Sequence, residues 1–327
     1  MLSEDQINEY HLNGVLVIEN VLTDEEVEIA REGMHKQLLG LGIDHDGVLN
    51  GEQVLEDGVR IKGKASRIFY NKWKINVHLH DKVYRYMKQL MEATYFSGRN
   101  KGYEHPFEKS TDILAYIDRI CWRLPDVIKS EGGLGLHLDR NPVDPYLKAG
   151  NGLTKWKPIQ SFVALTDQYG SNSGGLKVVK GFHHRINDYF AANTIEQGEN
   201  GEFYRLNSKS HAMLAKELQP INAPKGSLVC WDNRLPHATC QHLDGHDTRE
   251  VVYVGWLPNI ELNKKYCQQQ LDHIRANIAP PAYYEPRATE ISDLVAKSQV
   301  ERMERSDRNW AEEELSQRQK SMIGIDL

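Results

Sequence analysis

The chain has 327 residues, a net charge of −6 at pH 7 and 40% hydrophobic residues, which is enough for one large domain with a substantial core. The mild negative charge argues against a nucleic-acid-binding protein, which needs a basic face, and no apolar run is long enough to span a membrane. The first residues are acidic and polar, unlike a signal or transit peptide, and the four cysteines lack zinc-site spacing. We therefore expect a cytoplasmic protein with reduced thiols.

The first part of the chain predicts helices around one short strand. Ser3 and Thr23 are suitable N-cap residues for two helices, which end near residues 12 and 39. An apolar strand over residues 15–18 separates the two helices. The following segments predict a long loop over residues 40–62, a strand over residues 65–70 and a helix over residues 80–96.

The middle of the chain predicts many short strands, and its end predicts helices. The strands are expected near residues 116–124, 137–139, 159–165, 176–179, 228–231 and 251–256. A polar excursion over 187–220 carries one helix near 211–218, and a further helix is expected over 263–278. Short strands between helical ends favour one domain over residues 1–327, mainly β with flanking helices and a jelly-roll or barrel core. The core is expected at about 110–257, after N-terminal helices and a strand at 3–96. A C-terminal helical extension at 259–327 could cover the core or form a homodimer.

The most informative motif is His137-Leu138-Asp139, because residues two apart on a strand face the same side. With His237 as a third ligand, the side chains would hold one metal ion and leave half of an octahedral ion open. Non-haem Fe(II) oxygenases use such a set of two histidines and one carboxylate. A lone His-x-Asp is weak evidence, since His242-Leu243-Asp244 repeats it, but that second motif lies in a polar turn or loop.

The strand over residues 116–124 carries two arginines on one face. Arg119, Cys121 and Arg123 alternate with apolar residues. If this face lines a cavity, its guanidinium groups indicate an anionic substrate, because arginine binds carboxylates bidentately. The alternative is an ordinary solvated strand face.

Four blocks in this order resemble the phytanoyl-CoA dioxygenase family of Fe(II)/2-oxoglutarate oxygenases. They are the N-terminal helix–glycine–strand block at residues 10–22, the iron motif at 135–139, the glycine-rich block at 174–183 and the block from Pro224 to Arg249. The resemblance covers roughly residues 5–257 and implies a double-stranded β-helix, which is a jelly-roll (cupin-like) core. Residue 180 is lysine where the family usually has proline, and residue 182 is phenylalanine where it has serine. These departures put the family's acyl-CoA substrate in doubt.

The resemblance implies roles for individual residues. His137, Asp139 and His237 would bind Fe(II) and make up the catalytic centre. Arg249 would pair with the distal carboxylate of 2-oxoglutarate, with Thr239 and Gln160 as further co-substrate contacts. The expected substrate contacts are Arg119, Arg123, Phe162 and Arg67.

The implied reaction uses 2-oxoglutarate and O2 as co-substrates and releases succinate and CO2. It would oxidise an unactivated C–H bond of a small, anionic or amino-acid-like metabolite, by hydroxylation, desaturation or oxidative cyclisation, as in specialised metabolism. The alternatives are an acyl-CoA 2-hydroxylase, a peptide or protein hydroxylase, a Zn-dependent jelly-roll hydrolase or isomerase, and a pseudo-enzyme without iron. The expected partner is a small-molecule substrate rather than a nucleic acid or a membrane.

Overall fold

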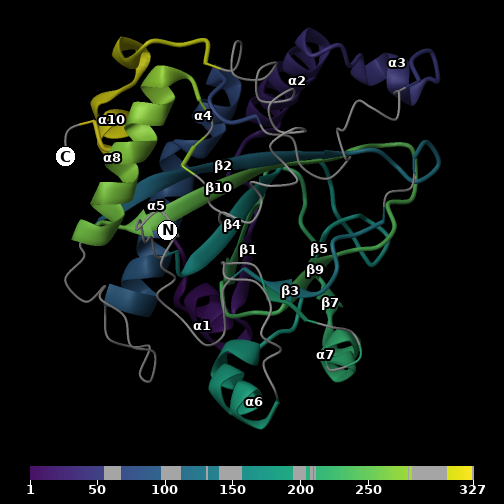
Figure 1. Ribbon diagram of the computed structural model, residues 1–327, viewed down its shortest axis with the longest axis vertical. Coiled ribbons are helices and arrows are strands. Elements are labelled where there is room, and N and C mark those ends of the chain that lie inside the picture. The colour runs from purple at the N-terminus through teal and green to yellow at the C-terminus, as the bar shows by residue number, and fades with distance from the viewer. Residues whose placement is uncertain are drawn as a thin grey trace, which may run out of the picture.

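Two antiparallel β-sheets of five strands each form the centre of the computed structural model (Figure 1). Sheet A has the strand order β1-β8-β4-β10-β2, and sheet B has the order β6-β3-β9-β5-β7. The structure describes residues 1–54, 68–96, 112–129, 132–139, 157–193, 204–206, 209, 211–278, 280–281 and 308–325. The arrangement confirms the predicted mainly β fold with flanking helices and a jelly-roll core.

Sheet A contains the longer strands and sheet B the shorter ones. Sheet A consists of β1 (Val15–Ile18), β2 (Ile113–Arg123), β4 (Ile159–Ala164), β8 (Leu228–Asp232) and β10 (Arg249–Pro258). Sheet B consists of β3 (His137–Leu138), β5 (Leu176–Val178), β6 (Tyr204–Arg205), β7 (Gln219–Pro220) and β9 (His237–Thr239). The predicted strand over residues 15–18 is therefore an edge strand of sheet A, paired with β8.

The helices begin where their caps predict. Ser3 and Gln6 form a capping box on α1 (Glu4–Asn13), and Thr23 and Glu26 form one on α2 (Asp24–Gly40). The other α-helices among the described residues are α3 (His45–Leu49), α4 (Lys72–His78), α5 (Asp81–Met91), α6 (Ile186–Ala192), α7 (Ala212–Glu217), α8 (Glu261–Ala276) and α10 (Gln317–Met322). Shorter helical turns are η1 (Glu92–Phe96), η3 (Phe182–His184) and η4 (Glu312–Glu314).

Two local predictions in the N-terminal region were wrong. The segment predicted as a loop over residues 40–62 contains helix α3, which is too short to show helical periodicity. A tertiary contact fixes α3, since the buried His45 accepts a hydrogen bond of 3.0 Å from the indole nitrogen of Trp122. The predicted strand at 65–70 is irregular from Ile68 to Tyr70, where buried apolar side chains lead into α4. Residues 55–67 lie outside the described part of the chain.

Sheet A separates two hydrophobic cores, because the side chains of its strands alternate between its faces. Val252 and Trp256 of β10 pack against the N-terminal helices, whereas Val251 lies in the core between the two sheets. Figure 1 shows α2 and α4 on the outer side of β2 and β10, with sheet B on the opposite side. The inner face of sheet A is thus the face that sheet B meets.

Helix α8 protects the edge of sheet A. Gln270 on α8 accepts a hydrogen bond of 2.7 Å from the backbone N–H of Ile117 and donates one of 3.0 Å to the carbonyl of Ala115. These contacts satisfy backbone groups on the edge strand β2 that would otherwise be open to strand pairing. This part of the predicted C-terminal extension therefore covers the core, and homodimer formation stays a prediction.

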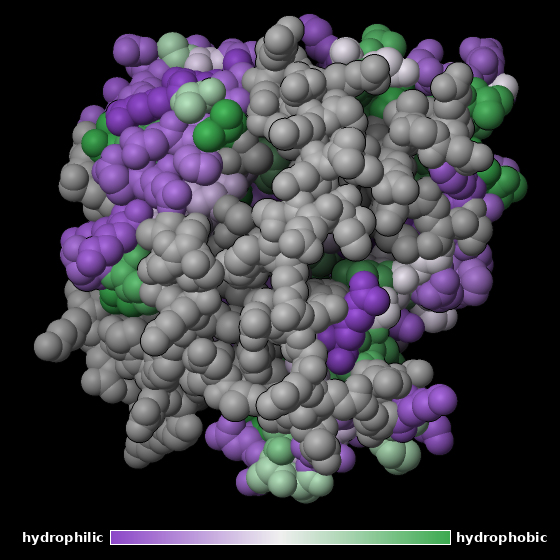
Figure 2. Space-filling model, in the orientation of Figure 1, coloured by the Kyte–Doolittle hydropathy of each residue, from purple (hydrophilic) through white to green (hydrophobic). Residues whose placement is uncertain are grey.

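The described surface carries its exposed hydrophobic residues as single side chains or small groups. Examples are Leu12 on α1, Ile29 and Leu39 ten residues apart on α2, and Tyr169 in the segment after β4, and Figure 2 shows small green groups among hydrophilic residues on one face. All four cysteines are buried, and none forms a disulfide. Within the described residues, no helix combines the length and the hydropathy that a membrane span requires.

The contact of α2 with sheet A includes a buried carboxylate, which predicts a stability change in acid. Burial alone would raise the pKa of Glu250, but the hydrogen bond from His35 and the charge of Arg31 lower it from 4.5 to about 2. A lowered pKa stabilises the fold above the unfolded value, and this contribution is lost as the pH falls from about 4.5 toward 2. We expect Glu250→Gln to remove roughly 3 kcal/mol of this pH-dependent stability.

Urea unfolding between pH 2 and 7 measures this effect. The exposed Glu28→Gln on the same helix is the matched control, because Glu28 lies 3.7 Å from Arg31 and its side chain is 53% exposed. Equal acid sensitivity of Glu250→Gln and the wild-type protein would contradict the assignment.

Candidate metal centre

Strands β3 and β9 bring together two histidines that are far apart in the sequence. His137 and His237 are direct partners in the antiparallel β3–β9 pair, and their ring centroids are 4.1 Å apart. The Nε2 atom of His137 lies 3.5 Å from Oδ1 of Asp139, and Nε2 of His237 lies 3.6 Å from Oδ2. The three predicted ligands therefore converge and could hold one metal ion.

Backbone carbonyls fix the ring orientation of both histidines. Nδ1 of His137 lies 2.7 Å from the carbonyl oxygen of Gly135, and Nδ1 of His237 lies 3.0 Å from that of Leu235. A carbonyl can only accept, so each Nδ1 carries the ring proton and each Nε2 keeps a lone pair in the neutral imidazole. Metal-binding histidines are held by such contacts on the far nitrogen.

The charge states of the triad also suit a metal ion. Burial and the neighbouring His237 lower the pKa of His137 from 6.5 to about 4, so its imidazole is neutral at pH 7. Burial alone would raise the pKa of Asp139, but its interactions with the two histidines and with Lys157 outweigh burial and lower this pKa below its ordinary value of 3.8, so the carboxylate is ionised at pH 7. Oδ1 of Asp139 is buried without a hydrogen-bond partner. Two imidazoles that direct Nε2 toward a carboxylate with one unpaired oxygen fit the donor set of a non-haem Fe(II) centre.

Gln160 on β4 holds the carboxylate ligand in place. Its Nε2 donates a hydrogen bond of 2.6 Å to Oδ2 of Asp139. The sequence predicts that Gln160 contacts the co-substrate. The structure shows in addition that Gln160 orients Asp139, a candidate metal ligand. The partner was not predictable, because Gln160 lies in sheet A whereas Asp139 directly follows a strand of sheet B.

This contact predicts a loss of metal affinity in Gln160→Leu. We expect Fe(II) affinity to fall about 10- to 100-fold, as is usual when a partner of a metal ligand is removed. Anaerobic metal titration measures the change. Gln89→Leu is the control, because that glutamine bonds the backbone of Leu2 far from the triad. Equal Fe(II) affinity in the Gln160→Leu and wild-type proteins would show that the hydrogen bond from Gln160 does not orient Asp139 for metal binding.

The triad opens on a cavity of about 380 Å³ between the two sheets, a volume in the range of small-molecule sites. The predicted residues Arg119, Arg123, Gln160, Phe162, Thr239 and Arg249 line it. Arg67 lies outside the described residues. Sequence reasoning missed Lys157 and Tyr253 in the lining, since neither belongs to a motif.

Arg249 places a buried cation in this cavity. Its Nε donates to Oε1 of Gln168 at 2.8 Å, its Nη1 lies 3.2 Å from Sγ of Cys121, and its guanidinium carbon lies 5.6 Å from the ring centre of Phe162. The side chain is 3% exposed, and within the described residues it forms no ion pair with a carboxylate. A buried charge without a counter-ion is costly, so the site favours an anionic ligand.

Two other predicted residues have hydrogen bonds within the protein. Arg123 donates to the carbonyls of Cys240 and Gln241, each at 2.9 Å, and to Asp126 at 3.1 Å. These contacts favour a structural role for Arg123 over substrate binding. The hydroxyl oxygen of Thr239 accepts from the backbone N–H of Leu134, so its own hydrogen can still be donated to a ligand.

A β-bulge in β2 places both an acidic and a basic side chain in the cavity lining. Ile117 pairs with Val254 of β10 and Ile120 pairs with Val252, so Asp118 and Arg119 together lie opposite one residue. Both line the cavity. The predicted face of Arg119, Cys121 and Arg123 is confirmed, but strict alternation could not reveal Asp118.

The second His-x-Asp motif is a surface feature, as its polar context predicts. Nδ1 of His242 lies 3.0 Å from Asp126, and Asp244 accepts a hydrogen bond of 2.7 Å from Asn172. The two side chains therefore serve separate loop contacts.

Comparison with known proteins shows related folds. Residues 156–314, just under half of the chain, match the family model described as Gig2-like. A protein of Dictyostelium discoideum, provisionally named a phytanoyl-CoA dioxygenase, is 24% identical over 197 residues, which cover 52% of this chain and 54% of that protein. The chain thus spans about half the length of this relative.

Two solved structures cover nearly the whole chain. The hypothetical protein JW0805 of Escherichia coli has a TM-score of 0.70 and 15% identity, covering 99% of this chain and 82% of that one. The GlcNAc Inducible Gene 2 protein (GIG2, DUF1479) of Candida albicans has a TM-score of 0.63 and 16% identity, covering 99% and 81%. The chain therefore has the fold of these proteins and is similar to the Gig2-like family from residue 156 to residue 314, while its similarity to a phytanoyl-CoA dioxygenase is distant.

Proposed function

We propose that this protein is an Fe(II)- and 2-oxoglutarate-dependent dioxygenase acting on a small, anionic or amino-acid-like metabolite. The main support is one arrangement: two imidazoles and a carboxylate with one unpaired oxygen border the same cavity as a buried arginine, which forms no ion pair with a carboxylate among the described residues. The iron, when bound with 2-oxoglutarate and O2, would supply the oxidation of a C–H bond, with release of succinate and CO2. The distant similarity to a phytanoyl-CoA dioxygenase agrees with this chemistry.

The residues of the chain would bind, orient and shield the reactants. His137, His237 and Asp139 would hold the metal on one side, leaving its other side toward the cavity. The guanidinium of Arg249 would bind the distal carboxylate of 2-oxoglutarate bidentately and so fix which end meets the metal. The apolar ring of Phe162, beside that guanidinium, would exclude water from the contact.

The charges in the cavity support the proposed substrate class. Arg119 and Lys157 line the cavity and supply positive charge toward which a substrate carboxylate would lie. Asp118, on the same bulge, offers a partner for an amino group. A cavity of about 380 Å³ that must also admit 2-oxoglutarate favours a small metabolite over an acyl-CoA or a peptide segment.

Titration of the anaerobic Fe(II) protein with 2-oxoglutarate tests the proposal. We expect a saturable metal-to-ligand charge-transfer band, followed by substrate-stimulated succinate release when amino acids and small organic acids are screened. Folded, iron-loaded protein without the band would refute the 2-oxoglutarate reaction and favour a Zn-dependent hydrolase or isomerase, which has no need of Arg249.

A further inference from the structure

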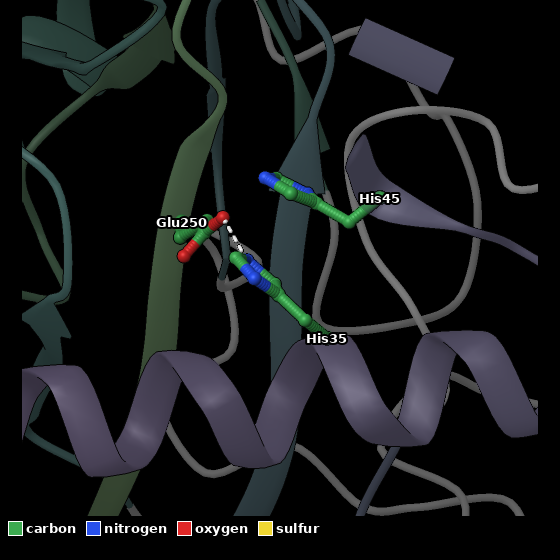
Figure 3. A group of neighbouring side chains, drawn as sticks. All are labelled: His35, His45 and Glu250. Carbon is green, nitrogen blue, oxygen red and sulfur yellow. Dashed lines mark hydrogen bonds and ion pairs between the residues drawn. The ribbon is translucent and has the colours of Figure 1, made fainter. Parts of the chain in front are cut away.

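Glu250 lies directly behind Arg249 on strand β10. Adjacent residues of a strand point to opposite faces, so Arg249 enters the cavity while Glu250 faces helix α2. Figure 3 shows the Glu250 carboxylate beside the imidazoles of His35 and His45. This cluster is the second group of possible metal ligands within the described residues.

The Glu250 carboxylate is fully buried and accepts hydrogen bonds at both oxygens. His35 and Thr248 each donate to Oε1 at 2.7 Å, and Nε of Arg31 donates to Oε2 at 2.9 Å. The backbone N–H of Glu250 also donates to the hydroxyl of Thr166 at 3.0 Å. These contacts connect the beginning of β10 to helix α2 and to Thr166, which lies just after β4.

The same hydrogen bonds argue against a metal ion in this cluster. The indole N–H of Trp122 can only donate, so Nδ1 of His45 accepts and the proton of its neutral ring lies on Nε2. Nε2 of His35 donates to Glu250, and the cation of Arg31 already pairs with the carboxylate. A metal ion would have to displace these protons and lie next to a guanidinium.

The imidazole of His45 extends the cluster toward strand β2. It stacks on His35 with 3.6 Å between ring centroids, and its donor Trp122 is the direct partner of Glu250 in the β2–β10 pair. On the other face of the same two strands, Arg249 contacts Cys121. The cluster therefore stabilises the pairing of β10, which carries Arg249, with β2, which carries Cys121.

We infer that Glu250, with Arg31 and His35 of α2, is a positioning network that holds Arg249 at the angle needed for the distal carboxylate of 2-oxoglutarate; the inference rests on the proposed function. A bidentate contact tolerates little misplacement, so it depends on surrounding residues that lock the arginine. Arg249 is the first residue of β10 and follows an exposed turn, and such strand ends open easily without an anchor. Glu250 supplies that anchor.

The test compares Glu250→Gln with the control Glu28→Gln, which removes a carboxylate near Arg31 outside the network. We expect the Kd and KM for 2-oxoglutarate to rise about tenfold in Glu250→Gln with a smaller change in kcat. Hydrogen exchange of the backbone amides at residues 249–251 should also become faster, while Glu28→Gln resembles the wild-type protein. His35→Leu is the milder second variant, and His35→Gln, which keeps a donor, should restore most of the affinity.

The outcomes separate the inference from the proposed function. Unchanged 2-oxoglutarate affinity in Glu250→Gln and in His35→Leu, with a normal charge-transfer band, overturns the positioning network alone. A wild-type protein without the band overturns the proposed function, and the inference with it. A second equivalent of bound metal that is lost in His45→Ala would replace the network by a metal site.

Discussion

We expect the replacement of Asp139 by alanine to abolish Fe(II) binding and substrate oxidation. The carboxylate would be the anionic ligand of the proposed iron site, and its Oδ1 accepts no hydrogen bond. Fe(II) at 100 times its dissociation constant should stabilise the wild-type protein by about 2.7 kcal/mol, and the variant should show no such gain. Anaerobic thermal unfolding with and without Fe(II), together with metal analysis, measures both effects.

The sequence itself supplies the control for this experiment. Asp244→Ala removes the carboxylate of the other His-x-Asp motif, which bonds Asn172 in a surface loop. It should retain the full Fe(II)-dependent stabilisation. Fe(II)-dependent stabilisation that survives in Asp139→Ala would place the metal elsewhere in the protein.

We expect the replacement of Arg249 by leucine to raise the KM for 2-oxoglutarate by roughly a hundredfold. Loss of one partner of a buried, hydrogen-bonded ion pair costs about 3 kcal/mol, and Arg249 is buried in the cavity wall. The KM of Arg249→Lys should lie between those of the wild-type protein and Arg249→Leu, because lysine keeps the charge but not the planar pair of donors. Initial rates of succinate formation at varied 2-oxoglutarate concentrations give the values.

Arg185→Leu is the control for the arginine series. Arg185 pairs with Glu217 outside the cavity lining, so its loss should leave the KM for 2-oxoglutarate near that of the wild-type protein. A normal KM in Arg249→Leu would mean that the distal carboxylate binds elsewhere, and it would also remove the reason for the network behind Arg249.

Local patterns in the sequence predicted the parts of the site that one strand determines. The alternation of a strand places His137 and Asp139 on one side and predicts the face of Arg119, Cys121 and Arg123 on β2. The third ligand, His237, is 100 residues further along the chain. It could be proposed as the best candidate for the third ligand, in agreement with the resemblance, but only the β3–β9 register places it opposite His137.

The remaining features depend on contacts between distant elements. The hydrogen bond from Gln160 to Asp139 joins the two sheets, and the bulge that exposes Asp118 exists only because β2 pairs with β10. Helix α3 has no sequence periodicity and is fixed by Trp122, 77 residues after His45. Glu250 carried no sequence signal, since its donors Arg31 and His35 lie more than 200 residues earlier on α2.

The β3–β9 register has a consequence for the lifetime of the protein. Strand β3 has only two residues, yet it meets β9 through the pair His137 and His237, so a shared ion would cross-link the two strands. Iron loading would then reinforce the β3–β9 pairing, which consists of this one residue pair, against local opening that exposes the chain to proteases. We expect chelated protein to be cleaved near residues 132–139 faster than the iron-loaded protein, which would tie its abundance to iron supply.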